Sequence, residues 1–315
     1  MKIEIVTPAP PRSRFGNRVT AIRWARILRS LGHRVVLTQA YLNQPCNVLV
    51  ALHAKRSYPS VRQFHLLHPE RPILLALTGT DLYRDLPRSR SARKSLELAT
   101  RIIVLQPKAS ERLETRFHGK VRVIYQSSPG SPAKASRLQR TFDVCVIGHL
   151  RPVKDPFRPA LAARRLPESS RVRILHLGAA MDERMAQRAR SEMRANPRYQ
   201  WVGELPPRRV QRILRQSALC VLPSRMEGGA NVISEAVVAG VPVLASRIPG
   251  SVGLLGGDYP GYFSVGDTAG LAKLLSRAEN DLMFRKGLAA CCRDLSPLFD
   301  PRREKKAWGD LLQEL

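Results

Sequence analysis

The clearest chemical pattern in the chain lies in residues 223–246, PSRMEGGANVISEAVVAGVPVLAS. Two glutamates, Glu227 and Glu235, are separated by seven residues, and Gly228 and Gly229 follow the first of them. Carboxylates accept hydrogen bonds from sugar hydroxyls, and backbone amides at a helix start bind phosphate. This combination predicts a site for a sugar attached to a phosphate-containing leaving group.

The glycine pair opens a predicted helix over residues 231–239. Asn231, Ser234 and Glu235 are spaced i, i+3 and i+4, so they share one face of that helix. From this face Glu235 could hold a ribose diol, while Ala230 and Asn231 lie at the phosphate-binding helix start. An amphipathic helix with a narrow solvated stripe would give the same pattern, and the sequence leaves that alternative open.

A second candidate loop, GHLRPVKDP at residues 148–156, follows a predicted strand. Gly148 begins it, two prolines stiffen it, and Arg151 and Lys154 carry positive charge. A diphosphate is the natural partner of such a loop. In a chain with 53 Lys and Arg, two cations alone carry little weight, so this prediction depends on the glutamate segment.

The loop PAPPRSRFGNR at residues 8–18 predicts an anion site in the first half of the chain. Guanidinium groups and the amides at a helix N-terminus both favour phosphate-like anions. A proline-stiffened loop with solvated arginines is the alternative. The candidate residues of this loop are Arg12, Arg14, Gly16, Asn17 and Arg18.

Two more predicted strands end in polar residues. In LTGTDLY, Gly79 permits close approach to a ligand, and the neighbouring Thr78, Thr80 and Asp81 can bind hydroxyls. Asp81 equally fits the cap of a short helix. His53 ends the other strand, at a position where a structural histidine is more common than a catalytic base.

The sequence lacks the motifs of several other classes of enzyme. The first predicted strand is not followed by GxGxxG, which disfavours a nicotinamide dehydrogenase, and the sequence has no P-loop and no GxSxG. Without a DxD motif we expect no metal and no other cofactor, because cations and a helix N-terminus can neutralise a leaving diphosphate. The five cysteines show no metal-ligand spacing and are expected to be reduced structural thiols.

Short apolar blocks alternate with amphipathic stretches along the chain, which predicts α/β domains with parallel sheets. Ligands of such sheets bind at the carboxyl ends of the strands, where all the loops above are expected. The predicted strands are residues 3–7, 35–38, 48–52, 73–78, 101–105, 121–125, 142–147, 172–177, 219–222 and 241–245. The predicted helices include residues 18–31, 183–194, 208–215, 231–239, 268–277 and 302–315.

Composition indicates two domains joined by a linker. Residues 131–140 lie in a stretch rich in Pro, Gly and Ser that predicts a linker between domain 1–130 and domain 141–298, with a C-terminal segment at 299–315. The 315 residues are 43 % apolar, as expected of a folded chain. With no apolar run of about 18 residues and a strand-like start, we expect a cytoplasmic protein without membrane insertion.

The formal net charge of +28 raises the possibility of a polyanionic partner. The arginines are scattered rather than gathered in one stripe, and aromatic residues, 6 % of the chain, are not interleaved with them. We therefore expect no nucleic-acid partner. A basic module that binds nucleic acid is kept as the alternative from another class of function.

These segments together resemble B-fold nucleotide-sugar glycosyltransferases with an E-x7-E donor site. More narrowly, PAPPRSRFGNRVTA, ALHAKRS, LTGTDLY, GHLRPVKDP and ASRIPGSVGLLG resemble the selenosugar synthases of selenoneine biosynthesis. The resemblance implies two Rossmann-like doubly wound domains facing a cleft, with a final helix that crosses back to the N-terminal domain. It implies transfer of glucose or N-acetylglucosamine from a UDP-sugar to selenophosphate, with a C–Se bond formed at the anomeric carbon.

The resemblance also implies residue roles. Lys154, Arg151 and Glu227 would be catalytic, with the two cations on the diphosphate and Glu227 on the hexose, while Glu235 would bind the ribose. The sequence departs from the family pattern at one position of the loop at residues 148–156, because it has His149 where many B-fold enzymes have Arg. The other donor contacts would be Gly148, Gly228, Gly229, Ala230 and Asn231. The acceptor contacts would be Arg12, Arg14, Gly16, Asn17, Arg18, His53, Thr78, Gly79, Thr80 and Asp81.

Selenophosphate is already an anionic, soft nucleophile, so the acceptor side would need cations and amides more than a general base. An ordinary UDP-sugar glycosyltransferase that acts on a carbohydrate or lipid acceptor is the alternative within enzymes.

Overall fold

The computed structural model of the chain describes residues 1–13, 15–130 and 140–315. It divides into two compact units. The first contains Met1–Ser127, Glu227–Gly229 and Asp300–Leu315, and the second contains Ser128–Met226 and Ala230–Phe299. The predicted linker lies outside the described residues, apart from Arg140.

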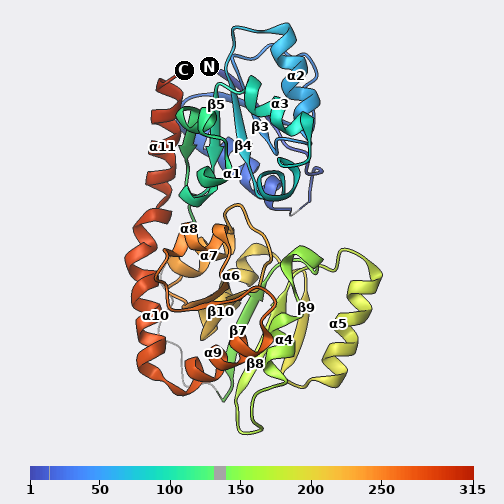
Figure 1. Ribbon diagram of the computed structural model, residues 1–315, viewed down its shortest axis with the longest axis vertical. Helices are drawn as coiled ribbons and strands as arrows, with labels where there is room; N and C mark the ends of the chain where they lie inside the picture. The colour runs from blue at the N-terminus through green and yellow to red at the C-terminus, as the bar shows by residue number, and fades with distance from the viewer. Residues whose placement is uncertain (14, 131–139) are drawn as a thin grey trace. The chain divides into compact units, whose positions relative to one another are not determined.

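The first unit is built on a parallel sheet whose described strands follow the order β2-β1-β3-β4-β5-β6. Helices lie on both sides of this sheet (Figure 1). The strands are β1 (Lys2–Val6), β2 (Arg34–Thr38), β3 (Val48–Leu52), β4 (Ile73–Leu77), β5 (Arg101–Val104) and β6 (Val121–Val123). The helices are α1 (Gly16–Ser30), α2 (Tyr58–Leu67), α3 (Arg90–Leu98) and α11 (Pro301–Gln313), with a π-helical turn at Asp81–Asp85 and 3-10 turns at Pro107–Arg112 and Thr115–Lys120.

Strand β3 shows why these strands are almost wholly apolar. Side chains alternate between the two faces of a strand, so Val48 and Val50 point to one face and Leu49 and Ala51 to the other. All four are buried, because each face is covered by helices with its own apolar cluster. The loops that follow the strands are therefore the places where this unit can present polar groups.

Helix α11 packs against α1 within the first unit, although it follows the second unit in the sequence. Asp300 caps it by accepting a hydrogen bond of 2.7 Å from the amide of Arg302. The rings of Trp308 and Trp24 meet edge to face, with their centroids 5.0 Å apart. Buried Glu304 accepts a hydrogen bond of 2.9 Å from the indole nitrogen of Trp24, so a polar bond fixes the register of the packing.

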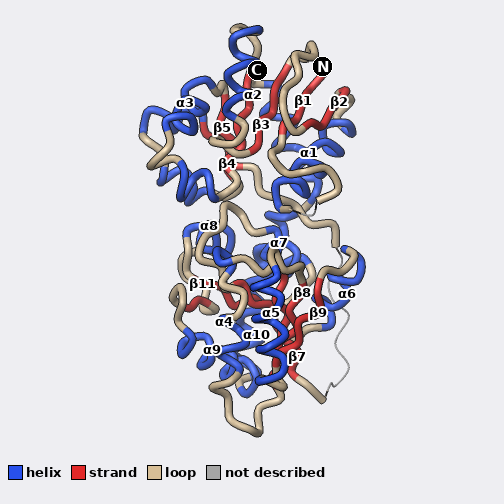
Figure 2. Tube along the Cα trace, turned by 90° about the vertical axis from the view of Figure 1, so that its right-hand side faces the viewer, coloured by secondary structure: helices blue, strands red, loops and turns tan. Residues whose placement is uncertain are grey.

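The second unit repeats the architecture, with described strands in the order β12-β11-β10-β7-β8-β9, all parallel. Its strands alternate along the chain with helices, and Figure 2 shows these helices in blue and the strands in red. The strands are β7 (Phe142–Ile147), β8 (Val172–Leu177), β9 (Tyr199–Gly203), β10 (Leu219–Leu222), β11 (Val243–Ser246) and β12 (Tyr262–Phe263). The helices are α4 (Arg158–Ala163), α5 (Glu183–Ala195), α6 (Pro207–Gln216), α7 (Asn231–Val238), α8 (Pro249–Leu255), α9 (Thr268–Asn280) and α10 (Leu282–Leu295), with 3-10 turns at Pro152–Lys154 and Ser296–Phe299.

The predicted fold class is confirmed, since each unit is a doubly wound parallel α/β layer structure. Every predicted strand is present, and β3, β7, β8 and β10 have the predicted bounds. Sequence reasoning missed β9, β12, α4, α8 and α10, and it gave no bounds for α2 and α3. Strand β9 is at the edge of its sheet and only partly buried, and β12 has two residues, so neither carries a strong apolar block.

Among the described residues, no helix combines the length and the hydrophobicity that crossing a membrane requires.

Candidate functional site

Two loops at the carboxyl ends of β7 and β10 lie side by side in the second unit. The amide of Arg225 donates a hydrogen bond of 2.9 Å to the carbonyl of Val153. This contact joins the loop that carries Lys154 to the loop that leads into Glu227. Sequence spacing could not reveal this contact, because it links residues 72 positions apart in the chain.

The residues around Lys154 are held by an ion-pair network. Lys154 ends a 3-10 turn, and Asp155 follows it in the left-handed region with φ of 44°. The carboxylate of Asp155 accepts a hydrogen bond of 3.0 Å from Arg158, and it lies 3.8 Å from the guanidinium of Arg225. Arg158 in turn donates to the hydroxyl of Thr268 at 2.6 Å. The backbone that presents Lys154 is thus fixed from two sides.

Sequence reasoning did not single out Arg225 or Asp155. Arg225 places a half-exposed guanidinium beside the Lys154 loop and adds positive charge there. The sequence alone could not distinguish Arg225 from the many other arginines of the chain. His149, where the family pattern has Arg, accepts a hydrogen bond of 3.1 Å at Nδ1 from the amide of Ala179, so its ring is part of the loop's support.

Helix α7 carries the second glutamate and begins at Asn231, as predicted. Ala230 is its N-cap residue and provides no side-chain cap, so the amides of the first turn have no partner from the cap side chain. Ser234 is buried and donates to the carbonyl of Asn231 at 2.9 Å. Only Asn231 and Glu235 of the predicted polar stripe are partly exposed, which makes the stripe narrower than expected.

Glu235 is partly buried on α7, and its charge acts on two buried thiols of the second unit. Burial raises the pKa of the Cys145 thiol to about 12, and the charge of Glu235 shifts it in the same direction. Burial also raises the pKa of Cys220, with Glu235 again contributing. The charge of Glu235 thus contributes to the electrostatics of two buried thiols, Cys145 on β7 and Cys220 on β10.

Glu227–Gly229 belongs to the first unit by its contacts. A Cβ atom built on Gly228 would lie 2.5 Å from the carbonyl oxygen of Thr78, and one on Gly79 would lie 2.7 Å from the backbone nitrogen of Gly228. A Cβ on Gly229 would lie 2.5 Å from the Cβ of Leu105. The glycines are therefore required for close packing of two predicted site loops, in addition to any approach of a phosphate.

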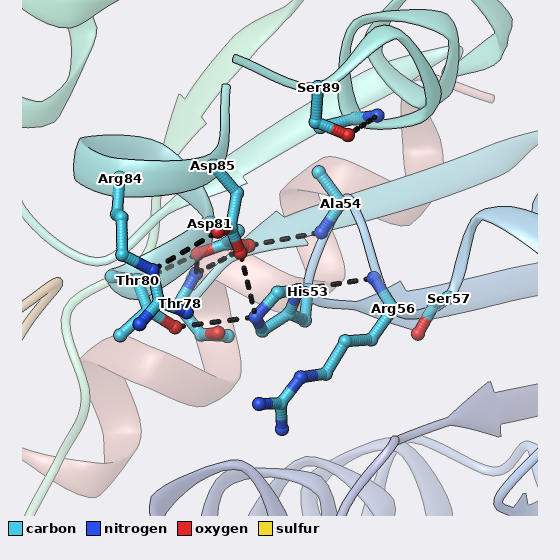
Figure 3. Close-up of polar contacts among 12 residues, drawn as sticks. His53, Ala54, Arg56, Ser57, Thr78, Thr80, Asp81, Arg84, Asp85 and Ser89 are labelled. Carbon is cyan, nitrogen blue, oxygen red and sulfur yellow. Dashed lines mark hydrogen bonds and ion pairs between the residues drawn. The ribbon is translucent and has the colours of Figure 1, made fainter. Parts of the chain in front are cut away.

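Asp81 in the LTGTDLY loop has a structural role (Figure 3). Its carboxylate is fully buried and accepts hydrogen bonds from the amides of Gly79 at 2.8 Å, Thr78 at 3.0 Å and Ala54 at 3.0 Å. It is neither the cap of a following helix nor exposed to a ligand. The expectation of a direct acceptor contact therefore does not fit its burial, and Asp81 instead shapes the loop.

His53 is also buried, with φ of 80°. The amide of Arg56 donates to Nδ1 at 3.3 Å, so the ring proton is on Nε2, which lies 3.3 Å from the hydroxyl of Thr80 and 3.7 Å from the carboxylate of Asp85. Burial lowers the pKa of His53, although Asp81 and Asp85 oppose the shift. Its basic nitrogen is already occupied, and the guanidinium of Arg56 points away from this cluster (Figure 3).

In the residues 8–18 loop, Gly16, Asn17 and Arg18 form the first turn of α1. The amides of Gly16 and Asn17 have no intrahelical acceptor. The Nε of Arg18 is buried and has no hydrogen-bond partner among the described residues. Arg12 is exposed, with φ of 65°, and Arg14 lies outside the described residues.

The described residues contain neither a metal-binding cluster nor a disulfide. Within the described ranges, no cluster of three or more His, Cys, Asp or Glu side chains could hold a metal ion. All five cysteines, which lie in the described part of the chain, are without disulfides. Burial raises the pKa of Cys46 and of Cys292, each to about 11, so these thiols are protonated at neutral pH.

Comparisons with known proteins agree on the architecture. Residues 132–288 match the family model described as glycosyl transferases group 1. Glycosyltransferase 1 domain-containing protein 1 of Xenopus tropicalis is 24 % identical over 270 residues, which is 78 % of each chain. Anabaena Alr3699/HepE, solved in complex with UDP and glucose, has a TM-score of 0.78 at 18 % identity over the full length of both chains. Sucrose-phosphate synthase from Thermosynechococcus elongatus has a TM-score of 0.79 at 16 % identity, covering 99 % of this chain and 98 % of its own.

Proposed function

We propose that this chain, whose residues 132–288 match the glycosyl transferases group 1 model and whose fold is similar to that of solved glycosyltransferases, transfers a hexose from a UDP-sugar to selenophosphate. The observation that carries the donor half of the proposal is the contact between Arg225 and Val153. It brings the Lys154 loop and the loop leading to Glu227 together at one edge of the second sheet. A diphosphate and its attached sugar would need both loops at once.

Each group of the proposed donor site has a role that follows from its chemistry. Lys154 and Arg151 supply charge for the diphosphate, and the amides at the start of α7 add the positive end of a helix. Glu227 would accept hydrogen bonds from the hexose, and Glu235 from the ribose. The Anabaena neighbour, solved with UDP and glucose, supports UDP as the nucleotide of the donor.

The acceptor half of the proposal depends on which groups could remove a proton. An alcohol acceptor gains from a general base, and the two candidate bases of the acceptor loops are His53 and Asp81. Both are buried and have their accepting atoms occupied by backbone amides. What these loops offer is the start of α1 with Gly16, Asn17 and Arg18, which suits an anion that is already a nucleophile.

The reaction proposed is a displacement at the anomeric carbon. A selenium lone pair of selenophosphate forms the C1–Se bond while the bond from C1 to the diphosphate oxygen breaks and UDP departs with its electron pair. Water then cleaves the P–Se bond, releasing phosphate and a hexose selenol. Lys154 and the helix start stabilise the charge that develops on UDP, which lowers the barrier of the first step.

The test is release of UDP from UDP-glucose and from UDP-N-acetylglucosamine, each with and without selenophosphate. We expect UDP release that requires selenophosphate, with phosphate as the second product. The alternative is an ordinary glycosyltransferase that acts on a carbohydrate or lipid. Release of UDP with such acceptors and not with selenophosphate would establish that alternative and refute the selenium chemistry.

A further inference from the structure

A buried histidine outside the predicted site holds the start of the Lys154 loop. His176 is on β8, next to β7 in the sheet, and its side chain is 1 % exposed. One ring nitrogen, Nε2, lies 3.1 Å from the carbonyl oxygen of Gly148, and the other, Nδ1, lies 3.1 Å from the hydroxyl of Tyr199. The ring therefore bridges strand β9 and the first residue of the loop.

The partners determine where the ring proton resides. A carbonyl oxygen can only accept, so Nε2 carries the proton and donates to Gly148. Burial lowers the pKa of His176 to about 4, so the ring is neutral at physiological pH and Nδ1 accepts from the Tyr199 hydroxyl. Tyr199 therefore donates a hydrogen bond to His176, and His176 donates one to Gly148. Both ring nitrogens have a hydrogen-bond partner.

The same peptide is packed from a second side by Gly178. A Cβ atom on Gly178 would lie 2.1 Å from the carbonyl oxygen of Gly148, and Gly178 has φ of 154°. Gly178 is itself held by the indole of Trp201, which donates to its carbonyl at 2.8 Å. The Gly148–His149 peptide thus rests against a fixed backbone, with His176 setting the direction of its carbonyl.

We propose that His176 is a positioning residue for the donor loop, and that it acts through the Gly148 carbonyl to set the path of the chain toward Arg151 and Lys154. In a trans peptide the carbonyl and the following N–H point in opposite directions, so fixing the carbonyl of Gly148 also fixes the amide of His149. The functional part of this inference rests on the proposed function, in which the loop binds a diphosphate.

The experiment compares His176→Leu, which removes both hydrogen bonds, with His176→Gln, whose amide can donate to Gly148 and accept from Tyr199. Tyr199→Phe is a milder variant that removes only the hydroxyl. His118→Leu is the matched control, because His118 makes an equivalent 3.1 Å contact with the carbonyl of Leu113 in the first unit. The readouts are hydrogen exchange of the peptide covering residues 148–154 without ligand, and the dissociation constant of UDP by calorimetry.

We expect exchange at residues 148–154 to rise at least tenfold in His176→Leu and UDP to bind about tenfold more weakly. His176→Gln should restore both values to within about threefold of wild type, and His118→Leu should change neither. Unchanged hydrogen exchange of the loop in His176→Leu overturns the inference. If that variant fails to fold, unchanged exchange in Tyr199→Phe overturns it. Increased exchange with unchanged UDP affinity also overturns it. Failure of the wild-type protein to bind UDP would refute the proposed donor and the functional part of this inference, whereas the exchange comparison still decides the positioning contact by itself.

Discussion

The carboxylate of Asp81 accepts a hydrogen bond of 2.8 Å from the backbone amide of Gly79. Two more amides, of Thr78 and Ala54, complete its coordination. A carboxylate held by three amides orders two loops at the carboxyl edge of the first sheet, because Ala54 and Thr78 lie in the loops that directly follow β3 and β4. This arrangement gives Asp81 a structural explanation and removes it from the groups that could deprotonate an acceptor.

Replacing Asp81 by Asn should destabilise the first unit by about 2–4 kcal/mol, since an amide group would turn a donor toward backbone donors in a buried site. Urea unfolding measures the loss. Asp310→Asn is the control, because Asp310 is exposed on α11 and pairs with the exposed Lys306 one turn earlier. Lost turnover with unchanged stability would show instead that Asp81 takes part in the reaction.

Replacing Lys154 by Ala should lower kcat about 100-fold, because the ammonium group stabilises negative charge on the departing UDP. Lys273→Ala, an exposed lysine of α9 in the same unit, should leave turnover unchanged. Steady-state kinetics with the UDP-sugar as the varied substrate give both values. Wild-type kinetics in Lys154→Ala would remove this residue from the mechanism.

The histidine on β8 predicts a dependence of stability on pH. The pKa of His176 is lowered from 6.5 to about 4 by burial, so the unfolded chain takes up this proton before the folded one does. The contribution of the neutral His176 ring to the free energy of unfolding is present above pH 6.5 and is lost as the pH falls toward 4. Between pH 7 and pH 5 the wild-type protein should lose about 2 kcal/mol more stability than His176→Gln does. Parallel losses in the two proteins, measured by urea unfolding at each pH, would contradict a neutral buried ring.

Replacing Glu304 by Gln should loosen α11 by about 1–3 kcal/mol. The carboxylate accepts from the indole of Trp24 at 2.9 Å and from the amide of Ser127 at 2.8 Å, and a glutamine can serve only one of these with its oxygen. Limited proteolysis should cut the C-terminal segment faster than in wild type. Glu111→Gln, at an exposed glutamate paired with Lys108, provides the control, and equal cleavage rates in both variants would refute the proposed role.

Much of the fold could be predicted because the central strands are buried on both faces. Strands such as β3 and β7 consist of continuous apolar residues that stand out in any window of the sequence. The C-terminal helix was predictable from the helical spacing of its apolar residues and from the Asp-Pro pair at its start. The edge strand β9 was not, since only one of its residues is fully buried and its glutamine and glycine weaken the pattern.

The candidate site was predictable in its loops and less so in its contacts. Strand ends marked where polar residues would gather, and this placed Lys154, Glu227 and Thr78 at carboxyl edges. The contacts of Arg225 with Val153 and of His176 with Gly148 depend on strand order and register, which no local pattern encodes. The contacts of Asp81 could not be predicted for a related reason, because its partner Ala54 comes from the loop after the neighbouring strand.

The most direct test of the central claim is the bond that forms at the anomeric carbon. UDP-glucose labelled with carbon-13 at C1 is incubated with the protein and selenophosphate, and the product is analysed by NMR and mass spectrometry, with UDP-N-acetylglucosamine run in parallel. The account predicts a product that contains selenium, with C1 coupled directly to selenium and one phosphate released for each UDP. A labelled C1 bound to oxygen in every product, with selenophosphate unconsumed, would contradict it.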